Sequence, residues 1–469
     1  MTRRDLLLAS SALSATGPTI EAQTRPRPNV LILIADDLND YSLLKSFPGV
    51  KTPYLDKFQR QSVTFTRAYC AAPACIPSRA ATFSGLYPHT TGAYLNDCDP
   101  WNKAPIQSAE PFPALFRRAG YAAFGAGKLT HARISKELER AMWDNEPYGG
   151  GFGPFVSDEE RGPEHKDRFW YPKAWTEPDT DFPDVRNADA AIDFLKQPHD
   201  KPFLLTLGLW RPHTPFTAPK RFFDLYDPAR LEIPVPGYRD GDMDDIPALG
   251  RKLSLLWGER FAGAGRGTEA EWRRFLYAYF ACTSFADWSA GRVIEALDAS
   301  PHGRDTWVFF FSDNGYHCGE KNHWEKTTLW EKSALTPILV RQPGAAQAGS
   351  RCARTVTQVD LYPTLREICD LPAPKHTLQG RSLMPLLRNP SAPWSHPALT
   401  TYGEGYASIR DERYRYIRYP DATEELYDHA ADPNEWNNLA AKPESAPIKN
   451  RLGSLIPAKF APTMGGRLG

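Results

Sequence analysis

Short apolar runs recur along the chain, and each ends close to polar or ionisable residues. The first run covers Asn29–Ala35 and is followed directly by Asp36 and Asp37. Three later runs share the pattern: Tyr121–Gly125 before Lys128, Phe203–Leu209 before His213, and Trp307–Phe311 before Asp313 and Asn314. Short runs rich in branched residues predict strands buried on both faces, as in a parallel sheet.

Helical patterns separate these runs. They cover Pro111–Ala119, Asn187–Lys196 and Glu269–Leu297. The alternation of strands and helices predicts an α/β fold with a doubly wound, mostly parallel sheet flanked by helices. Ligands bind at the carboxyl ends of the strands in such sheets, so we expect the polar groups beyond the four runs to converge in space.

Two irregular stretches interrupt this alternation. Residues 132–183 are rich in Gly, Pro, Trp and acidic residues and show weak periodicity, and residues 227–259 are similarly irregular. Long segments of this kind often carry binding residues. We therefore expect both stretches to lie near the substrate entrance.

The character of the chain changes near residue 380. Three short antiparallel strands are predicted beyond it: Tyr402–Arg410, Tyr414–Tyr419 and Glu425–Asp428. A helix is expected from about Asn437. The predicted division is a large α/β domain over residues 28–380 and a smaller C-terminal α+β subdomain, with an antiparallel sheet, over residues 381–469.

The composition is that of an ordinary globular protein, since 41% of the 469 residues are hydrophobic and 24% are charged. Lys and Arg together number 56, as do Asp and Glu. This balance provides no global field that would attract nucleic acid or an acidic membrane surface, so an anionic substrate must be attracted locally. Seven cysteines occur without a Cys-x-x-Cys pair, which argues against a zinc ribbon or a thioredoxin-like site.

The N-terminus differs from the rest of the chain. Arg3 and Arg4 precede a weakly apolar stretch that is too short, and too rich in Ser and Thr, for a membrane span of about 20 apolar residues. Residues 1–22 resemble a twin-arginine export signal, which predicts a periplasmic or secreted protein. Because such proteins are exported folded, we expect the fold not to depend on disulfides. The alternative is a frayed basic N-terminus of a cytosolic protein.

Cys75 begins the most informative stretch, Cys75-Ile-Pro-Ser-Arg79, which is followed by Ser84-Gly85. One helical turn would place Cys75 and Arg79 side by side, and a guanidinium beside a thiol would stabilise negative charge there. On these residues alone, a buried structural cysteine beside a surface arginine is the alternative interpretation.

The C-x-P-S-R core with its following Ser-Gly resembles the signature of the sulfatase family, in the alkaline-phosphatase-like superfamily. Further motifs match in the same order: Asp36-Asp37, Gly127-Lys128-x-x-His131, Arg211-Pro212-His213, Ser312-Asp-Asn-Gly315, Glu325-Lys326 and, more weakly, Leu426–Leu439. The Asp-Asp, Gly-Lys-x-x-His, Pro-His and Trp-x-Lys arrangement is most similar to iduronate-2-sulfatase-like enzymes. The resemblance implies an alkaline-phosphatase-like fold and hydrolysis of a sulfate ester.

Four oxygen donors follow two of the predicted strands: Asp36, Asp37, Asp313 and Asn314. Hard oxygen ligands suit Ca²⁺ or Mg²⁺ better than Zn²⁺. The resemblance implies Ca²⁺, with Cys75 as a further ligand position. Iduronate-2-sulfatases usually carry Asp-His where this chain has Asp313-Asn314, but the amide oxygen of Asn314 can also coordinate. Taken alone, each pair of residues is also typical of a turn.

The resemblance also implies the chemistry. Cys75 would be oxidised to formylglycine by a formylglycine-generating enzyme, and its hydrated form would be the nucleophile. Three cations would hold the sulfate oxygens: Arg79, Lys128 and Lys326. His131 would orient the formylglycine or take its proton. His213, together with Lys326, would donate a proton to the departing oxygen.

Four further residues are candidate substrate contacts, with packing as the alternative: Tyr316, His317, His323 and Trp324. The predicted substrate is a sulfated carbohydrate, and choline sulfate or aryl sulfates remain open. Two other functions are weighed against this one. The first is a phosphonate or phosphate ester hydrolase on the same scaffold, and the second is an inactive carbohydrate-binding relative.

Overall fold

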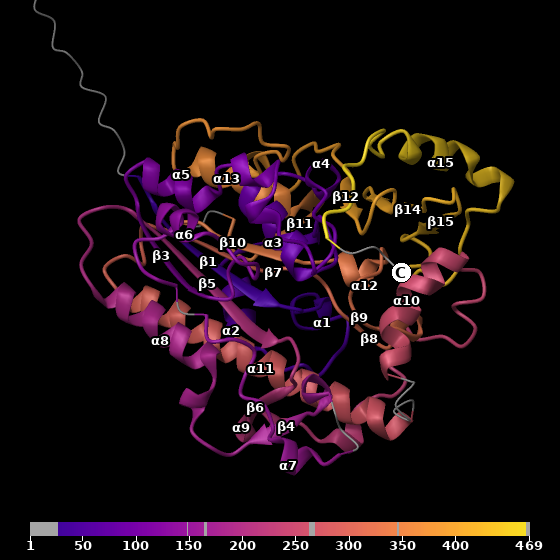
Figure 1. Cartoon of the computed structure of the whole chain (residues 1–469), viewed down its shortest axis with the longest axis horizontal. Coiled ribbons are helices and arrows are strands. Elements are labelled where there is room, and N and C mark those ends of the chain that lie inside the picture. Colours follow the sequence, from indigo (N-terminus) through magenta and orange to yellow (C-terminus); the bar gives the residue numbers. More distant parts are fainter. Residues whose placement is uncertain (1–26, 148, 164–166, 262–267, 345–346, 466–469) are drawn as a thin grey trace, which may run out of the picture.

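The centre of the computed structural model is a seven-stranded sheet with the order β11-β2-β10-β7-β1-β5-β3 (Figure 1). The structure describes residues 27–147, 149–163, 167–261, 268–344 and 347–465. The strands of this sheet are β1 (Asn29–Asp36), β2 (Val63–Tyr69), β3 (Ala122–Gly127), β5 (Phe203–Pro212), β7 (Thr306–Ser312), β10 (Ile338–Arg341) and β11 (Arg351–Thr357). β10 runs antiparallel to both of its neighbours, and the other pairs are parallel. The predicted mostly parallel α/β sheet is confirmed.

Helices cover both faces of the sheet. They are α1 (Asp40–Leu43), α2 (Pro53–Gln59), α3 (Cys75–Ser84), α4 (Pro88–Thr91), α5 (Phe112–Arg118), α6 (Lys136–Met142), α7 (Asp158–Arg161), α8 (Pro183–Lys196), α9 (Lys220–Phe223), α10 (Ala248–Phe261), α11 (Glu269–Ala299), α12 (Glu331–Ala334), α13 (Leu361–Ile368), α14 (Met384–Arg388) and α15 (Ala446–Gly453). Among the described residues, no helix is long and apolar enough to cross a membrane.

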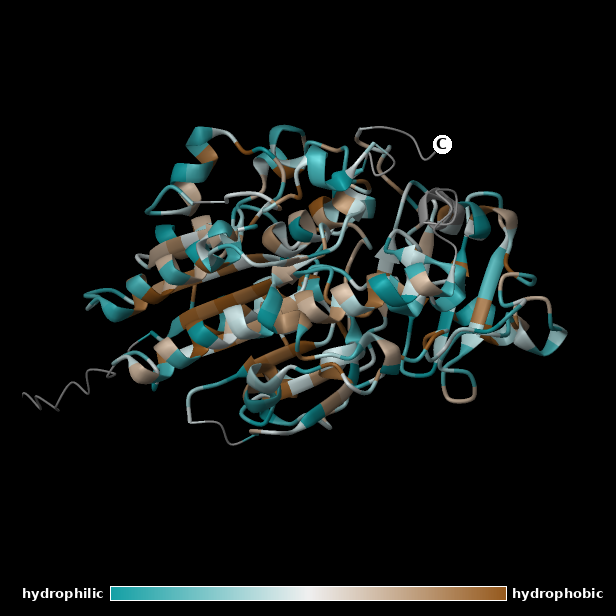
Figure 2. Ribbon diagram, turned by 90° about the horizontal axis from the view of Figure 1, so that it is seen from below, coloured by the Kyte–Doolittle hydropathy of each residue, from teal (hydrophilic) through white to brown (hydrophobic). Residues whose placement is uncertain are grey.

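Strand β1 shows how the core is divided between the two faces. Its residues Val30, Ile32 and Ile34 belong to one hydrophobic cluster, with side chains from α3, α5 and α13. The alternate residues Leu31 and Leu33 belong to a second cluster, with side chains from α2, α8 and α11. Figure 2 shows the apolar strands between these two helical layers. A strand buried on both faces is apolar at every position, which is why this run was recognisable in the sequence.

A four-stranded antiparallel sheet lies near the C-terminus, as predicted. It consists of β12 (Ala398–Thr401), β13 (Ala407–Arg410), β14 (Tyr414–Arg418) and β15 (Glu424–Asp428). The prediction of one strand over residues 402–410 was wrong, because Gly403 and Gly405 adopt φ values of 113° and 83° and turn the chain between β12 and β13. The domain boundary at residue 380 stays a prediction.

Two other expectations about secondary structure were wrong. The last helix begins at Ala446 and not near Asn437, because the Asn437 backbone N–H donates to Asp432 and holds a turn there. The stretch 227–259, expected to be irregular, contains most of α10. The short strands β4 (Lys173–Trp175) and β6 (Thr217–Pro219) pair with each other, and β8 (His317–Cys318) pairs with β9 (Trp324–Glu325).

A buried ion network joins the C-terminal sheet to the loop after β9. Arg415 on β14 is fully buried and forms ion pairs with Glu331, at the start of α12, and with Glu435, at 2.7 Å. The Arg415 guanidinium also donates to the carbonyl of Leu329 at 3.0 Å. The backbone N–H of Glu331 donates to the Glu435 carboxylate at 2.8 Å. Arg415, with Arg410 and His429 beside it, therefore balances the two carboxylates across this junction.

We predict that Arg415→Met destabilises the protein, because Glu331 and Glu435 would lose the buried cation between them and keep only Arg410 and His429 as partners. Removing one partner of a buried pair costs about 3–5 kcal/mol, which chemical denaturation would measure. Arg413→Met is the matched control, since Arg413 pairs with Asp428 at the surface of the same strand region. An equally small change in both variants would contradict the structural role of Arg415.

Candidate active site

The carboxyl ends of three central strands meet at one cluster of ionisable groups. Asp36 ends β1, Asp37 follows it, and Asp313 follows β7. Cys75 is the first residue of α3, which lies shortly after β2. Ligand atoms of these four residues all lie within 4.8 Å of one another. The predicted convergence of residues that are distant in sequence is therefore seen in the structure.

Cys75 lies fully buried within this cluster. Its Sγ is 3.5 Å from Asp36 Oδ1 and 3.2 Å from Lys326 Nζ. Burial and the negative charge of Asp36 raise the pKa of the Cys75 thiol, and the nearby lysines offset this only in part. The Arg79 guanidinium attracts negative charge on this sulfur, as the sequence suggested. Burial and Asp36 outweigh that attraction, so the pKa of the thiol is raised on balance.

Arg79 lies one helical turn after Cys75 and faces the same cluster. Its Nε donates to Asp313 Oδ2 at 2.8 Å, and its Nη2 is 3.8 Å from Asp36 Oδ1. A further donor of the guanidinium contacts the backbone carbonyl of Lys128. Arg79 is thus a buried, ion-paired residue and not the surface arginine of the alternative interpretation.

Two lysines pair with the aspartates at the end of β1. Lys128, just beyond β3, contacts Asp36, and Lys326 Nζ lies 2.5 and 2.6 Å from the two oxygens of Asp37. Burial alone would lower the pKa of Lys326, but Asp37 outweighs it, and the net shift of this pKa is upward. Lys326 therefore keeps its proton within the site.

His213 and His131 complete the group of residues proposed to act on the substrate. His213 Nε2 is 3.7 Å from Asp37 Oδ2, and its Nδ1 is 2.6 Å from the carbonyl of Thr214. Burial, followed by the charges of Lys326 and Lys128, lowers the pKa of His213. Burial and the charge of Lys128 likewise lower the pKa of His131. Both rings are accordingly neutral before an anion binds.

Asn314 supplies an observation that bears on metal binding. Its amide nitrogen donates to Asp37 Oδ1 at 2.7 Å, while its buried Oδ1 has no hydrogen-bond partner among the described residues. Burial raises the pKa of Asp313, Arg79 opposes this, and Asp36 adds to the rise. A divalent cation would satisfy the amide oxygen and relieve the crowding of carboxylates. The residues present therefore fit a hard cation such as Ca²⁺ or Mg²⁺.

The four predicted substrate contacts lie in the packed interior. Tyr316 and His317 are each 1% exposed, His323 is 0% exposed and Trp324 is 4% exposed. Tyr316 stacks on Tyr279 with ring centroids 5.3 Å apart, and His323 Nε2 is 2.8 Å from the carbonyl of Lys326. Their burial favours the packing alternative, in which they hold the loop that carries Lys326. Contact with substrate stays a prediction.

Two residues that sequence analysis missed contact the site. Gln358 Oε1 accepts from Ser78 Oγ on α3 at 2.9 Å, and its amide donates to the carbonyl of Ser312 at 2.5 Å, so it ties α3 to the end of β7. Phe152 packs on His213 with ring centroids 4.6 Å apart. Phe152 lies within the irregular stretch 132–183. The sequence pointed to it only through the expectation that this stretch lies near the substrate entrance.

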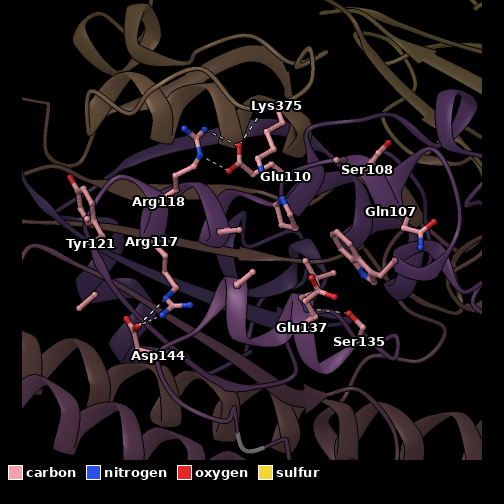
Figure 3. A pocket seen from close by; sticks show the side chains of 18 of the residues that line it. Gln107, Ser108, Glu110, Arg117, Arg118, Tyr121, Ser135, Glu137, Asp144 and Lys375 are labelled. Atoms are coloured by element: carbon pink, nitrogen blue, oxygen red, sulfur yellow. Dashed lines mark hydrogen bonds and ion pairs between the residues drawn. The ribbon is translucent and has the colours of Figure 1, made fainter.

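A separate cavity lies at the opposite end of β3 and β5. It has a volume of about 1070 Å³ and is lined by residues that precede these strands, among them Tyr121 and Lys201 (Figure 3). Its labelled arginines are paired, Arg118 with Glu110 at 2.7 Å and Arg117 with Asp144 at 2.6 Å. The cavity is therefore distinct from the cluster around Cys75.

The sequence of the chain is similar to that of known enzymes. Residues 28–371 match the family described as Sulfatase, and residues 319–459 match the C-terminal region described as N-sulphoglucosamine sulphohydrolase. A sulfatase of Formosa agariphila is 35% identical over 445 residues, covering 88% of this chain and 83% of that protein. The chain belongs to the sulfatase family and is a sulfuric ester hydrolase.

More specific relatives include enzymes of uronic acids. The chain is 28% identical to the Delta 4,5-hexuronate-2-O-sulfatase of Bacteroides thetaiotaomicron, covering 91% of this chain and 87% of that one. It is 27% identical to the iduronate 2-sulfatase of Homo sapiens, covering 72% and 64%. The predicted similarity to iduronate-2-sulfatase-like enzymes is confirmed.

The fold is shared with solved structures. A phosphonate monoester hydrolase of Agrobacterium radiobacter superposes with a TM-score of 0.76 at 22% identity, covering 92% of this chain and 95% of that one. A 2-O GAG sulfatase superposes with a TM-score of 0.73 at 23% identity, covering 92% and 91%. These likenesses show that the chain shares the fold of these two enzymes.

We predict that an unmodified Cys75 thiol reacts very slowly with iodoacetamide in the folded protein. The thiolate is the reactive form, and burial together with the raised pKa keeps the thiol protonated from pH 7 to pH 9. Mass spectrometry of the Cys75 peptide would measure labelling before and after unfolding in urea. Labelling of the folded protein as fast as of the unfolded one would contradict the described burial.

Proposed function

We propose that this sulfatase hydrolyses the sulfate ester of a carbohydrate through a formylglycine derived from Cys75, beside a bound Ca²⁺. The observation that carries this proposal is the position of Cys75. Its sulfur lies among three carboxylates and touches the Lys326 ammonium, at the meeting point of the strand ends. An ordinary structural cysteine has no need of such surroundings.

A formylglycine at position 75 would, once hydrated, supply a hydroxyl group that can attack sulfur and a second hydroxyl that can then expel sulfate. The unmodified thiol is poorly suited to attack, because its pKa is raised. Cys75 is also inaccessible in the folded chain. A formylglycine-generating enzyme must therefore act on this residue before the fold closes around it.

The residues proposed to hold Ca²⁺ are Asp36, Asp37, Asp313, Asn314 and the group at position 75. Bound there, the cation would neutralise sulfate oxygens and favour ionisation of the nucleophile. The unpartnered amide oxygen of Asn314 and the three adjacent carboxylates support this assignment. Mg²⁺ is the alternative cation.

The cations of the chain would bind the sulfate group. Lys128 and Lys326 pair with Asp36 and Asp37, which belong to the proposed metal site. Both ammonium groups become available to sulfate oxygens once these carboxylates hold a cation. Arg79 contributes a third positive charge and keeps Asp313 in place.

The two histidines would handle protons. His213, together with Lys326, would protonate the departing oxygen. The Thr214 carbonyl holds Nδ1 of the His213 ring, which turns Nε2 of the same ring towards Asp37 and the proposed metal site. Negative charge on a bound sulfate would offset the lysines that lower the pKa of His213. His131, near Lys128, would orient the nucleophile or take its proton.

The proposed substrate class is a carbohydrate with a 2-O-sulfated uronic acid. The names of the hexuronate and iduronate sulfatases among the relatives support this choice. Choline sulfate and aryl sulfates are the other organic sulfates to be assayed. Residues 1–22, the proposed twin-arginine signal, lie outside the described residues, and on their sequence we propose a periplasmic or secreted location.

We predict that the matured protein releases sulfate from 2-O-sulfated uronate disaccharides at least about 10-fold faster than phosphonate or phosphate from comparable esters. Ion chromatography would measure both products, and mass spectrometry would detect the aldehyde at position 75.

Cys75→Ala should keep the fold and lose at least about 10³-fold in kcat. Faster turnover of phosphonate monoesters would favour the phosphonate hydrolase alternative, and a folded wild type bearing the aldehyde but inactive on all esters would favour the binding-protein alternative.

Metal dependence provides a separate prediction. Chelation should abolish activity, and Ca²⁺ should restore it and raise the melting temperature, because the crowded carboxylates gain a counter-charge. Asn314→Ala should weaken Ca²⁺ binding measured by calorimetry, whereas Asn102→Ala, a surface change at the rim of the separate cavity, should not. Full activity after exhaustive chelation would refute the proposed metal site.

A further inference from the structure

The loop of residues 149–154 is held by the end of β5 and the segment that follows it. Trp210 Nε1 donates to the carbonyl of Gly149 at 2.7 Å, and Arg211 Nη1 donates to that of Phe152 at 2.8 Å. Thr217 Oγ1 donates to the carbonyl of Pro154 at 3.1 Å. Three side chains thus fix the backbone of this loop at both ends and in the middle.

The Phe152 ring is the part of this loop that reaches the active site. Its centroid lies 4.6 Å from that of the His213 ring, 4.8 Å from Lys128 Nζ and 5.6 Å from the centroid of the His131 ring. Trp210 packs against it in turn, at 4.5 Å. One half-buried aromatic side chain therefore touches three residues of the proposed catalytic group.

His213 depends on such a contact for its orientation. The contact of Nδ1 with the Thr214 carbonyl fixes one edge of the imidazole, while Nε2 is 3.7 Å from Asp37 and lacks a close hydrogen bond there. A ring anchored at one atom can still rotate out of the site. The packed face of Phe152 removes that freedom, and Arg211, two residues before His213, holds the backbone of Phe152.

We propose that Phe152 is a positioning residue that sets His213 for proton transfer to the departing oxygen. The inference rests on the proposed function. As an oxygen of the hydrated formylglycine bonds to sulfur, the S–O bond to the leaving group breaks and its electron pair goes to the departing oxygen. That oxygen takes a proton from Nε2 of His213, which is protonated once the sulfate anion is bound and is left neutral with its remaining proton on Nδ1. A ring displaced by about 1 Å would lose much of this assistance, since such misplacement can cost about 100-fold.

The aromatic character of residue 152 also suits Lys128. A ring face attracts an ammonium group without accepting a directed hydrogen bond from it. The N–H groups of Lys128 can then turn from Asp36 to an anion while the ammonium stays over the ring. An aliphatic side chain of similar size would fill the space and lack this attraction.

The test compares two sulfate esters that differ in how much they need a proton donor. With 4-nitrophenyl sulfate the departing phenolate is stable, whereas phenyl sulfate releases a more basic oxygen. Phe152→Ala should lower kcat on phenyl sulfate about 10- to 100-fold and on 4-nitrophenyl sulfate less than about 3-fold. Phe152→Tyr should restore kcat on phenyl sulfate, because the ring is kept.

Phe155→Ala is the matched control. Phe155 belongs to the same stretch of chain but packs on Phe169 at 5.1 Å and under Arg168. This variant should treat both esters as the wild type does. Should Phe152→Ala reduce the fold stability, Phe152→Leu fills most of the space without the flat ring and should show a smaller selective loss in the same direction.

The outcomes distinguish a failure of the positioning role of Phe152 from a failure of the proposed function. An equal loss of kcat on both esters, or the same selective loss in Phe155→Ala, would overturn the positioning role of Phe152. Absence of sulfate release from both esters and from 2-O-sulfated uronate disaccharides, by a folded wild type that carries the aldehyde, would instead count against the proposed function. A selective loss that Phe152→Tyr reverses would support both.

Discussion

Compensation of buried charge is the constraint on which the rest of the structure depends. Three aspartates are brought together at the strand ends, and each is paired with a lysine or an arginine inside the protein. A carboxylate without a partner in this interior would carry a large desolvation cost. Helix α3 positions Arg79, the segment after β3 positions Lys128, and the loop after β9 positions Lys326.

The fold followed from the sequence where burial leaves a clear pattern. Strand β1 and its parallel neighbours are apolar on both faces, and the polar residues that end them mark the sheet edge. The strands β2 and β11 mix polar with apolar residues, so they could not be distinguished from loops. The turn at Gly403 and Gly405 was lost within a run that otherwise reads as one strand.

The sequence predicted those site residues that belong to a recognisable motif. Motifs supplied Cys75, its arginine and the two lysines, but they carry no information on what packs around them. His317 and His323 are buried within their own loop, where they contact Glu320, Lys326 and Trp330, and residue spacing does not show whether such a loop folds inward or faces solvent. Phe152 is likewise invisible to pattern analysis, because its neighbour His213 is 61 positions away and the loop has no periodicity.

The internal pairing of Lys128, Lys326 and Arg79 also bears on how the enzyme encounters its substrate. Charges that neutralise one another at short range cast little field into the solvent, and the chain as a whole carries no net charge. A bound Ca²⁺ would add two positive charges to this balanced set, so the attraction of the site for an anion would depend on that cation. The attraction would act close to the site and would weaken as salt screens it.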